Sequence, residues 1–184
     1  MVMAAMITVA RVADAAEPRQ LPAIHLQMDN AAKVPAGILN KSLDEVTRIF
    51  ADAGLGVEWT ETAPRFTVRI VRISLRYARE SSTVMGVTLR KPGGGTAQIL
   101  FNQVQDFARA YGVDVSTLLA YVIAHEIGHL LLPGIPHSAT GLMKAEWDRA
   151  LFREATAGSL TFTDAQIKRI LSADAGLGFG LSAP

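Results

Sequence analysis

Three residues near the middle of the chain have the types and the spacing that metal chemistry needs. His125, Glu126 and His129 form the pattern H-E-x-x-H. On a helix, side chains at positions i and i+4 lie one above the other, so both imidazoles can reach one metal ion. Glu126 then lies beside the metal, where it can act as a base toward a water molecule. Three of the four histidines fall within thirteen residues, which argues against a chance occurrence of the motif.

The segment around this motif has the composition of a buried helix. Residues 115–132 contain a single glycine and no proline, and a Pro-Gly pair follows them. Asp114 or Ser116 can cap the amino-terminal end. Apolar residues occur on every side, which is typical of a helix that is enclosed by the rest of the protein. A lone carboxylate such as Glu126 is costly there unless a cation lies close by, so the composition favours a metal site.

The residues after the predicted helix extend the motif. His137 is followed directly by Ser138, and the sequence Gly-Leu-Met then ends at Met143. This stretch resembles the metzincin metalloproteases, with features of the matrix metalloproteinases, in which H-E-x-x-H-x-x-G-x-x-H precedes a methionine-containing turn. The resemblance implies one catalytic zinc ion, a general base, and a methionine beneath the metal. The matching positions are His125, His129 and His137 for the zinc ligands, Glu126 for the base and Met143 for the turn.

The loop before the third histidine differs from the family pattern. The family has its third histidine six residues after the second, whereas His137 lies eight residues after His129. Leu132 occupies the position of the family's glycine. Glu146, seventeen residues after His129, is therefore an alternative third ligand, and it would complete a two-histidine, one-glutamate site of the thermolysin-like kind. Asp148 is a further candidate.

Length and composition indicate one globular domain. The chain has 184 residues, of which 49% are hydrophobic and 19% are charged, and its net charge is +1. This charge balance does not indicate binding to nucleic acid or to an acidic membrane surface. The lack of cysteine excludes disulfides, thiolate ligands and thiol catalysis. No stretch reaches about 18 uninterrupted apolar residues, so no integral membrane segment is predicted.

The two ends of the chain are expected to lie outside this domain. Residues 1–20 are mostly apolar at first and then carry small residues around Ala13 and Ala15, which favours a signal peptide or a disordered leader. A cleaved signal would make the protein secreted or periplasmic. Residues 21–175 are expected to form the catalytic domain, and residues 176–184 a flexible tail.

Local patterns predict the elements that position the motif. Strands are expected over residues 21–28, 57–60, 66–74, 84–90 and 97–102, with a loop over residues 91–96. Further helices are expected over residues 34–53, 145–157 and 163–173, and a capping box of Thr163 and Gln166 begins the last of them. A capping box of Ser42 and Glu45 gives an alternative start for the first of them, at Leu43. The fold class is α+β: a mixed, twisted sheet of four to five strands with a long active-site helix and a C-terminal helix, which the resemblance makes a metzincin-like (zincin) catalytic domain.

The resemblance also implies how a substrate binds and what the protein does. The strand at residues 84–90 would form the upper rim of the cleft, and a peptide would lie antiparallel to its free edge. The expected function is zinc-dependent hydrolysis of peptide bonds in a peptide or protein substrate, by water with Glu126 as general base. The alternatives are a structural zinc protein and a catalytically inactive protein-binding module on the same fold. The sequence does not indicate an oligomeric state.

Overall fold

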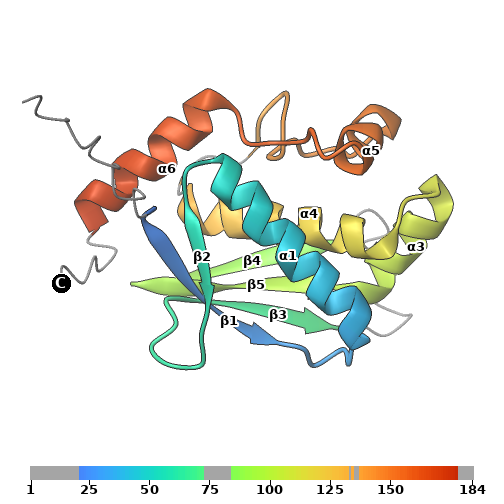
Figure 1. Cartoon of the computed structure of the whole chain (residues 1–184), viewed down its shortest axis with the longest axis horizontal. Coiled ribbons are helices and arrows are strands. Elements are labelled where there is room, and N and C mark those ends of the chain that lie inside the picture. Colours follow the sequence, from blue (N-terminus) through green and yellow to red (C-terminus); the bar gives the residue numbers. More distant parts are fainter. Residues whose placement is uncertain (1–20, 73–83, 133, 135–136, 178–184) are drawn as a thin grey trace, which may run out of the picture.

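The chain forms a mixed α+β fold with a five-stranded sheet and five helices in its described part (Figure 1). The structure, a computed structural model, describes residues 21–72, 84–132, 134 and 137–177, with only the backbone described over residues 173–177. The predicted leader and most of the predicted tail lie outside these residues. The α+β class and the mixed sheet are confirmed, while the narrower metzincin fold and the domain limits stay predictions.

The sheet is mixed because one strand runs against the other four. The strands are β1 (Ala23–Asp29), β2 (Gly56–Trp59), β3 (Phe66–Val71), β4 (Gly86–Lys91) and β5 (Gly94–Leu100), in the spatial order β2-β1-β3-β5-β4. All neighbours are parallel except β4, which pairs antiparallel with β5 at one edge. On β3, Phe66, Val68 and Ile70 are buried while Arg69 is exposed. This alternation shows that one face of the sheet packs against the core.

Helices α1 (Ala36–Asp52) and α4 (Val115–Leu131) pack against each other and against the sheet (Figure 1). Helix α3 (Phe101–Tyr111) follows β5 directly and leads into α4. Helices α5 (Arg149–Thr156) and α6 (Asp164–Leu177) lie beyond α4, on the side away from the sheet in Figure 1. Helix α4 is therefore enclosed by other elements, and fourteen of its seventeen residues are buried, as its composition predicts.

The connection between β4 and β5 is shorter than the sequence predicts. The loop expected over residues 91–96 is wrong, since only Pro92 and Gly93 link the two strands. Gly93 has a φ of +76°, a left-handed conformation that glycine adopts without strain. Gly95 belongs to β5, where a Cβ would lie 2.6 Å from Leu130 Cδ2. This glycine allows a helix to approach the strand closely, and it does not mark a loop.

Helix α1 begins before the predicted capping box. Its first residue is Ala36, and Ser42 lies buried inside the helix. The Ser42 hydroxyl donates to the carbonyl oxygen of Ser116 at 2.9 Å, which ties α1 to the first turn of α4. Glu45 accepts two hydrogen bonds from the Arg48 guanidinium, at 2.7 and 2.9 Å. The alternative start at residue 43 is therefore wrong, because both polar side chains have other partners.

Other boundaries differ by a few residues. Helix α3 begins at Phe101, within a segment whose β-like composition predicts strand up to residue 102. Helix α5 begins at Arg149 rather than at residue 145, because Asp148 caps it and accepts hydrogen bonds from the backbone of Ala150 and Leu151 at 2.9 Å each. The strand predicted over residues 66–74 ends at residue 71, and residues 73–74 lie outside the described part.

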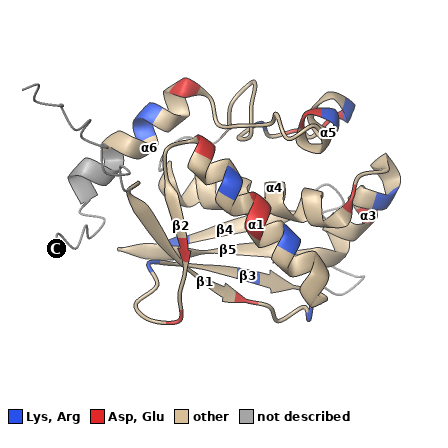
Figure 2. Cartoon of the chain, viewed as in Figure 1, with Lys and Arg blue, Asp and Glu red and all other residues tan. Residues whose placement is uncertain are grey.

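Charged residues are spread over the described surface in both signs, as Figure 2 shows along α1. Arg48 on this helix pairs with Asp52 at 2.6 Å in addition to Glu45, and Arg69 on β3 pairs with Asp29 at 3.1 Å. In the part of the chain that the structure describes, no helix has both the length and the apolar character to cross a bilayer.

The cap of α4 leads to a prediction on pH. Asp114 accepts a hydrogen bond from the Ser116 hydroxyl, and it also accepts from the backbone N–H groups of Ser116 and Thr117 at 2.9 and 3.1 Å. These bonds, led by that of the hydroxyl, lower the pKa of the Asp114 carboxyl. A carboxyl whose pKa is lower in the folded state stabilises the fold above its unfolded pKa of about 3.9, and this contribution is lost as the pH falls through the folded pKa.

We expect Asp114→Ala to lose about 1 kcal/mol of unfolding free energy at neutral pH, because the cap is removed. Asp114→Asn keeps an acceptor but does not titrate, so its deficit relative to wild type should shrink as the pH falls below about 4. Urea unfolding of the three proteins across this pH range measures both effects. A deficit of Asp114→Asn that is the same at every pH would contradict the prediction.

Candidate metal centre

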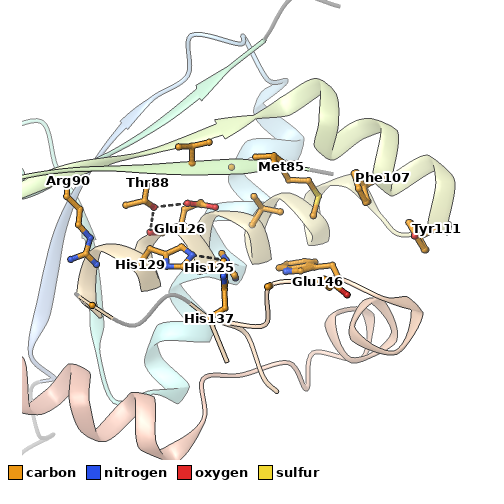
Figure 3. A pocket seen from close by; sticks show the side chains of 17 residues that line it. Met85, Thr88, Arg90, Phe107, Tyr111, His125, Glu126, His129, His137 and Glu146 are labelled. Atoms are coloured by element: carbon orange, nitrogen blue, oxygen red, sulfur yellow. Dashed lines mark hydrogen bonds between the residues drawn. The ribbon is translucent and has the colours of Figure 1, made fainter. Parts of the chain in front are cut away.

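The three histidines of the sequence motif meet at one point. His125 and His129 lie one turn apart on α4, and their Nε2 atoms are 3.1 Å apart. His137 reaches the same point from the loop that follows α4 (Figure 3). Each side chain offers one ring nitrogen, and these nitrogens all lie within 4.8 Å of one another. The three imidazoles can therefore form a metal site.

The separation of the two helical nitrogen atoms fits a zinc ion. Zinc–nitrogen bonds of about 2.0–2.1 Å place two ligands of a tetrahedral site about 3.3 Å apart. The separation of the Nε2 atoms of His125 and His129 is 3.1 Å, close to that value. The Nδ1 atom of His125 lies 2.8 Å from the carbonyl oxygen of Leu142. An Nδ1–H that donates to this oxygen leaves the lone pair on Nε2, directed at the cluster.

Burial keeps the two helical imidazoles neutral. It is the main reason why the pKa of His125 and that of His129 are both lowered to about 4. For His129, positive charge on the other two histidines and on Arg90 lowers the pKa further. Since a metal ion binds the neutral form of histidine, protons compete little for these two nitrogens at neutral pH.

Glu126 lies on α4 between the two helical histidines and faces β4. The Thr88 hydroxyl lies 2.7 Å from the Glu126 Oε2 atom and 3.0 Å from its backbone carbonyl oxygen. Gly86 lets the strand pass close to this side chain, because a Cβ there would lie 2.6 Å from the Glu126 Cγ. Burial raises the pKa of Glu126 to about 7, and the hydrogen bond from Thr88 opposes this rise. A nearby cation would favour the charged carboxylate.

The cluster opens into a cleft of about 990 Å³. Strand β4 runs along one side of this cleft, and the loop that carries His137 and Glu146 runs along the other (Figure 3). Phe107 and Tyr111 from α3 lie at one end of the cleft, and Arg90 lies at the opposite end, beside His129 (Figure 3). The site is therefore accessible to a ligand far larger than a metal ion.

Met143 is buried against α4 where Gly128 leaves room for it. A Cβ at residue 128 would overlap the Met143 Sδ and would lie 3.0 Å from the Phe162 Cε1. The preceding residue, Leu142, donates its N–H to the Thr161 carbonyl oxygen at 2.8 Å and accepts from His125. The turn that contains Met143 thus supports a histidine of the cluster through the backbone of its neighbour.

We expect Gly128→Ala to destabilise the protein by about 1 kcal/mol and to weaken zinc binding. Alanine favours the helix by about 0.5–1 kcal/mol, but moving Met143 and its neighbours in a packed core costs about 1–3 kcal/mol. The shifted turn also carries the carbonyl oxygen that orients His125. Gly37→Ala on α1 is the matched control, because no atom lies within 4 Å of a Cβ there. Urea unfolding and zinc titration measure both effects, and equal stability of the two variants would contradict the packing argument.

The alternative third ligands lie apart from the cluster. Glu146 lines the cleft, but it does not join the three histidines in the metal-binding group found among the described residues. Asp148 caps α5 and pairs with Lys144 at 2.6 Å. The fourth histidine, His25, pairs with Glu58 at 3.2 Å on neighbouring strands. The structure therefore brings His137 to the helical pair, and its role as a ligand stays a prediction.

The sequence predicted no role in the site for three residues that lie near it: Thr88, Arg90 and Gln166. The amide of Gln166 donates to the Ser138 hydroxyl oxygen at 3.0 Å, while its own oxygen accepts from the backbone of Thr163 at 2.9 Å. The predicted capping box of α6 is thereby confirmed, and it also holds the residue next to His137. No local pattern connects these residues with the motif; for Thr88 and Arg90 the only signal is the two-residue period of a strand.

Comparisons with known proteins give limited information. No protein-family model matches this chain, and no curated protein matches it. Among solved structures, it is similar to a zinc-dependent peptidase from Methanocorpusculum labreanum (strain Z) at 16% sequence identity, with a TM-score of 0.46. The match covers 80% of this chain and 99% of the other. Because this likeness is weak, it carries no functional argument, and the function proposed below rests on the geometry of the site.

Proposed function

We propose that this chain is a zinc-dependent endopeptidase with a metzincin-like catalytic domain and one catalytic zinc ion. The observation that carries the proposal is the cluster of three imidazoles beside a buried glutamate in an open cleft. His125, His129 and His137 would hold the ion. Three protein ligands leave one coordination position for water or substrate, which is typical of catalytic zinc sites.

Glu126 supplies the proton chemistry in this proposal. When bound, zinc lowers the pKa of a water molecule and polarises a carbonyl group. Glu126 takes the proton of the attacking water and passes it to the leaving amine. Burial raises the pKa of this carboxyl, and a bound cation would favour its charged form, which is the form that accepts a proton. The Thr88 hydroxyl, 2.7 Å from Oε2, orients the carboxyl.

The rim of the cleft suits an extended peptide. Strand β4 is at the edge of the described sheet, so its outer backbone N–H and C=O groups face away from β5. An extended chain can pair with such an edge and gain main-chain hydrogen bonds. The backbone of a peptide would then run past Glu126, which lies under β4.

The two alternatives have less support. A structural zinc site has four protein ligands, whereas the group found among the described residues contains three, and these open into a cleft. An inactive binding module would need neither a metal-binding cluster nor a carboxylate beside it. The experiment described next distinguishes both alternatives from a zinc-dependent peptidase.

The experiment combines metal analysis with a cleavage assay on the same preparation. Zinc per chain is measured after dialysis, and cleavage of casein and of a peptide library is measured before chelation, after chelation and after zinc is added back. We expect one zinc ion per chain and cleavage that chelation abolishes and zinc restores. Zinc without cleavage would indicate a structural site or an inactive module, and a chain that binds no zinc would refute the proposal.

A further inference from the structure

Arg90 is a charged residue of the cleft that the proposed chemistry does not use. Its guanidinium lies at the His129 end of the cleft (Figure 3). Among the described residues, it takes part in no hydrogen bond and no ion pair. A guanidinium has five N–H donors and normally satisfies them with carboxylates, carbonyl oxygens or water. Arg90 therefore has its full hydrogen-bonding capacity available for a ligand.

The register of β4 directs this side chain toward the catalytic helix. Gly86 and Thr88 both lie against Glu126 of α4. Side chains two residues apart on a strand share a face and are about 6.7 Å apart along it. Arg90 follows Thr88 by two residues and so belongs to the same face. Val87 and Leu89 point the other way and are 41% and 56% exposed.

The two ends of the cleft differ in charge, and the positive charge lies at the Arg90 end. Arg90 is the only Lys or Arg among the described residues that line it, and it lies beside His129 (Figure 3). The two acidic lining residues are Glu126, which is bonded to Thr88, and Glu146, which lies beyond His125 (Figure 3). No carboxylate of the lining therefore neutralises the Arg90 end.

We propose that Arg90 selects substrates with an acidic side chain on the amino side of the scissile bond, an inference that rests on the proposed peptidase function. Antiparallel pairing gives the more favourable strand hydrogen bonds. A peptide antiparallel to β4 has its amino-terminal part at the Arg90 end, because β4 runs from Gly86 toward that end. The planar guanidinium of Arg90 then binds the carboxylate of the acidic substrate residue through two parallel hydrogen bonds. The residues after the scissile bond meet Phe107 and Tyr111.

The first test measures binding without turnover. Zinc-loaded Glu126→Gln protein is titrated with fluorescent peptides, acetylated and amidated at their ends, that differ only in carrying Asp, Asn or Lys before the scissile bond. We expect the Asp peptide to bind about fivefold more tightly, and this preference to weaken at high salt because the charges are screened. Adding Arg90→Gln should remove the preference, Arg90→Glu should reverse it toward a Lys peptide, and Arg90→Lys should retain part of it.

Lys91→Gln is the matched control, because Lys91 is the next basic residue of β4 and does not line the cleft. It removes the same charge, and the preference for Asp should remain. A preference that Arg90→Gln leaves intact, or that Lys91→Gln removes equally, would overturn the role of Arg90. Thermal unfolding of each variant shows whether the fold is retained.

The second test separates this inference from the proposed function. Wild-type protein and the Arg90 variants are given a peptide library, and the residues around each cleaved bond are identified. Acidic residues enriched on the amino side in wild type, and lost in Arg90→Gln, would support the inference. Cleavage without that enrichment, or with enrichment on the carboxy side, would overturn the inference alone. An absence of any cleavage by zinc-loaded wild type would overturn the proposed function, whatever the binding test shows.

Discussion

Glu126→Gln is expected to reduce peptide hydrolysis by about a hundred- to ten-thousandfold while one zinc ion remains bound. Glutamine has nearly the same shape and can still accept the hydrogen bond that Thr88 donates at 2.7 Å. It cannot take a proton from water, so the general base is lost and the ligands are not. Values of kcat/KM for a fluorogenic peptide, together with zinc content, test both parts of this result.

Glu146→Gln is the control for this experiment, since Glu146 also lines the cleft but lies apart from the histidine cluster. Its effect on kcat/KM should stay within about threefold, as expected for an exposed charge. If Glu126→Gln kept wild-type turnover, Glu126 would not be the base. If it lost zinc as well as activity, the loss of turnover would say nothing about proton transfer.

The second large effect is expected from removing a ligand. His129→Ala and His137→Ala should each abolish stoichiometric zinc binding and, with it, all hydrolysis. Zinc at a hundred times its Kd stabilises a folded protein by about 2.7 kcal/mol, and this increment disappears when the site is lost. Thermal unfolding with and without zinc should therefore show a shift in wild type and none in the two variants.

Two further variants make this result specific. His25→Ala removes a histidine that pairs with Glu58 away from the cluster, and it should keep both zinc and the thermal shift. Glu146→Ala should do the same if His137 is the third ligand. If zinc binding survived His137→Ala and failed in Glu146→Ala, the two-histidine, one-glutamate site would be correct instead.

The central helix could be predicted closely because its signals are local. The structure begins α4 at Val115 and ends it at Leu131, against a prediction of residues 115–132. Asp114 forms the cap, one of the two residues that the sequence offers. The apolar run and the Pro-Gly pair that follows all lie within twenty residues of one another. The same holds for the Thr163–Gln166 capping box that begins α6.

The rest of the site depends on contacts between distant parts of the chain. Thr88 donates a hydrogen bond to Glu126, which lies 38 residues further along the chain. No local pattern around either residue predicts that the two are in contact. The order of the strands decides that β4, and not β2, faces the histidines. The choice between His137 and Glu146 depends on the path of the loop after α4, which residue spacing alone left open. Glycine is ambiguous for a similar reason: Gly93 forms a turn, whereas Gly95 lies in a strand pressed against Leu130.

The hydrogen bond from Gln166 to Ser138 has a consequence for the timing of biosynthesis. A ribosome releases a chain from its amino end, and domains fold as their last elements emerge. The histidines of α4 thus leave the exit tunnel well before the glutamine that holds the loop of His137. If the chain is the proposed peptidase, its metal site is therefore completed only after α6 has packed against the loop that carries His137.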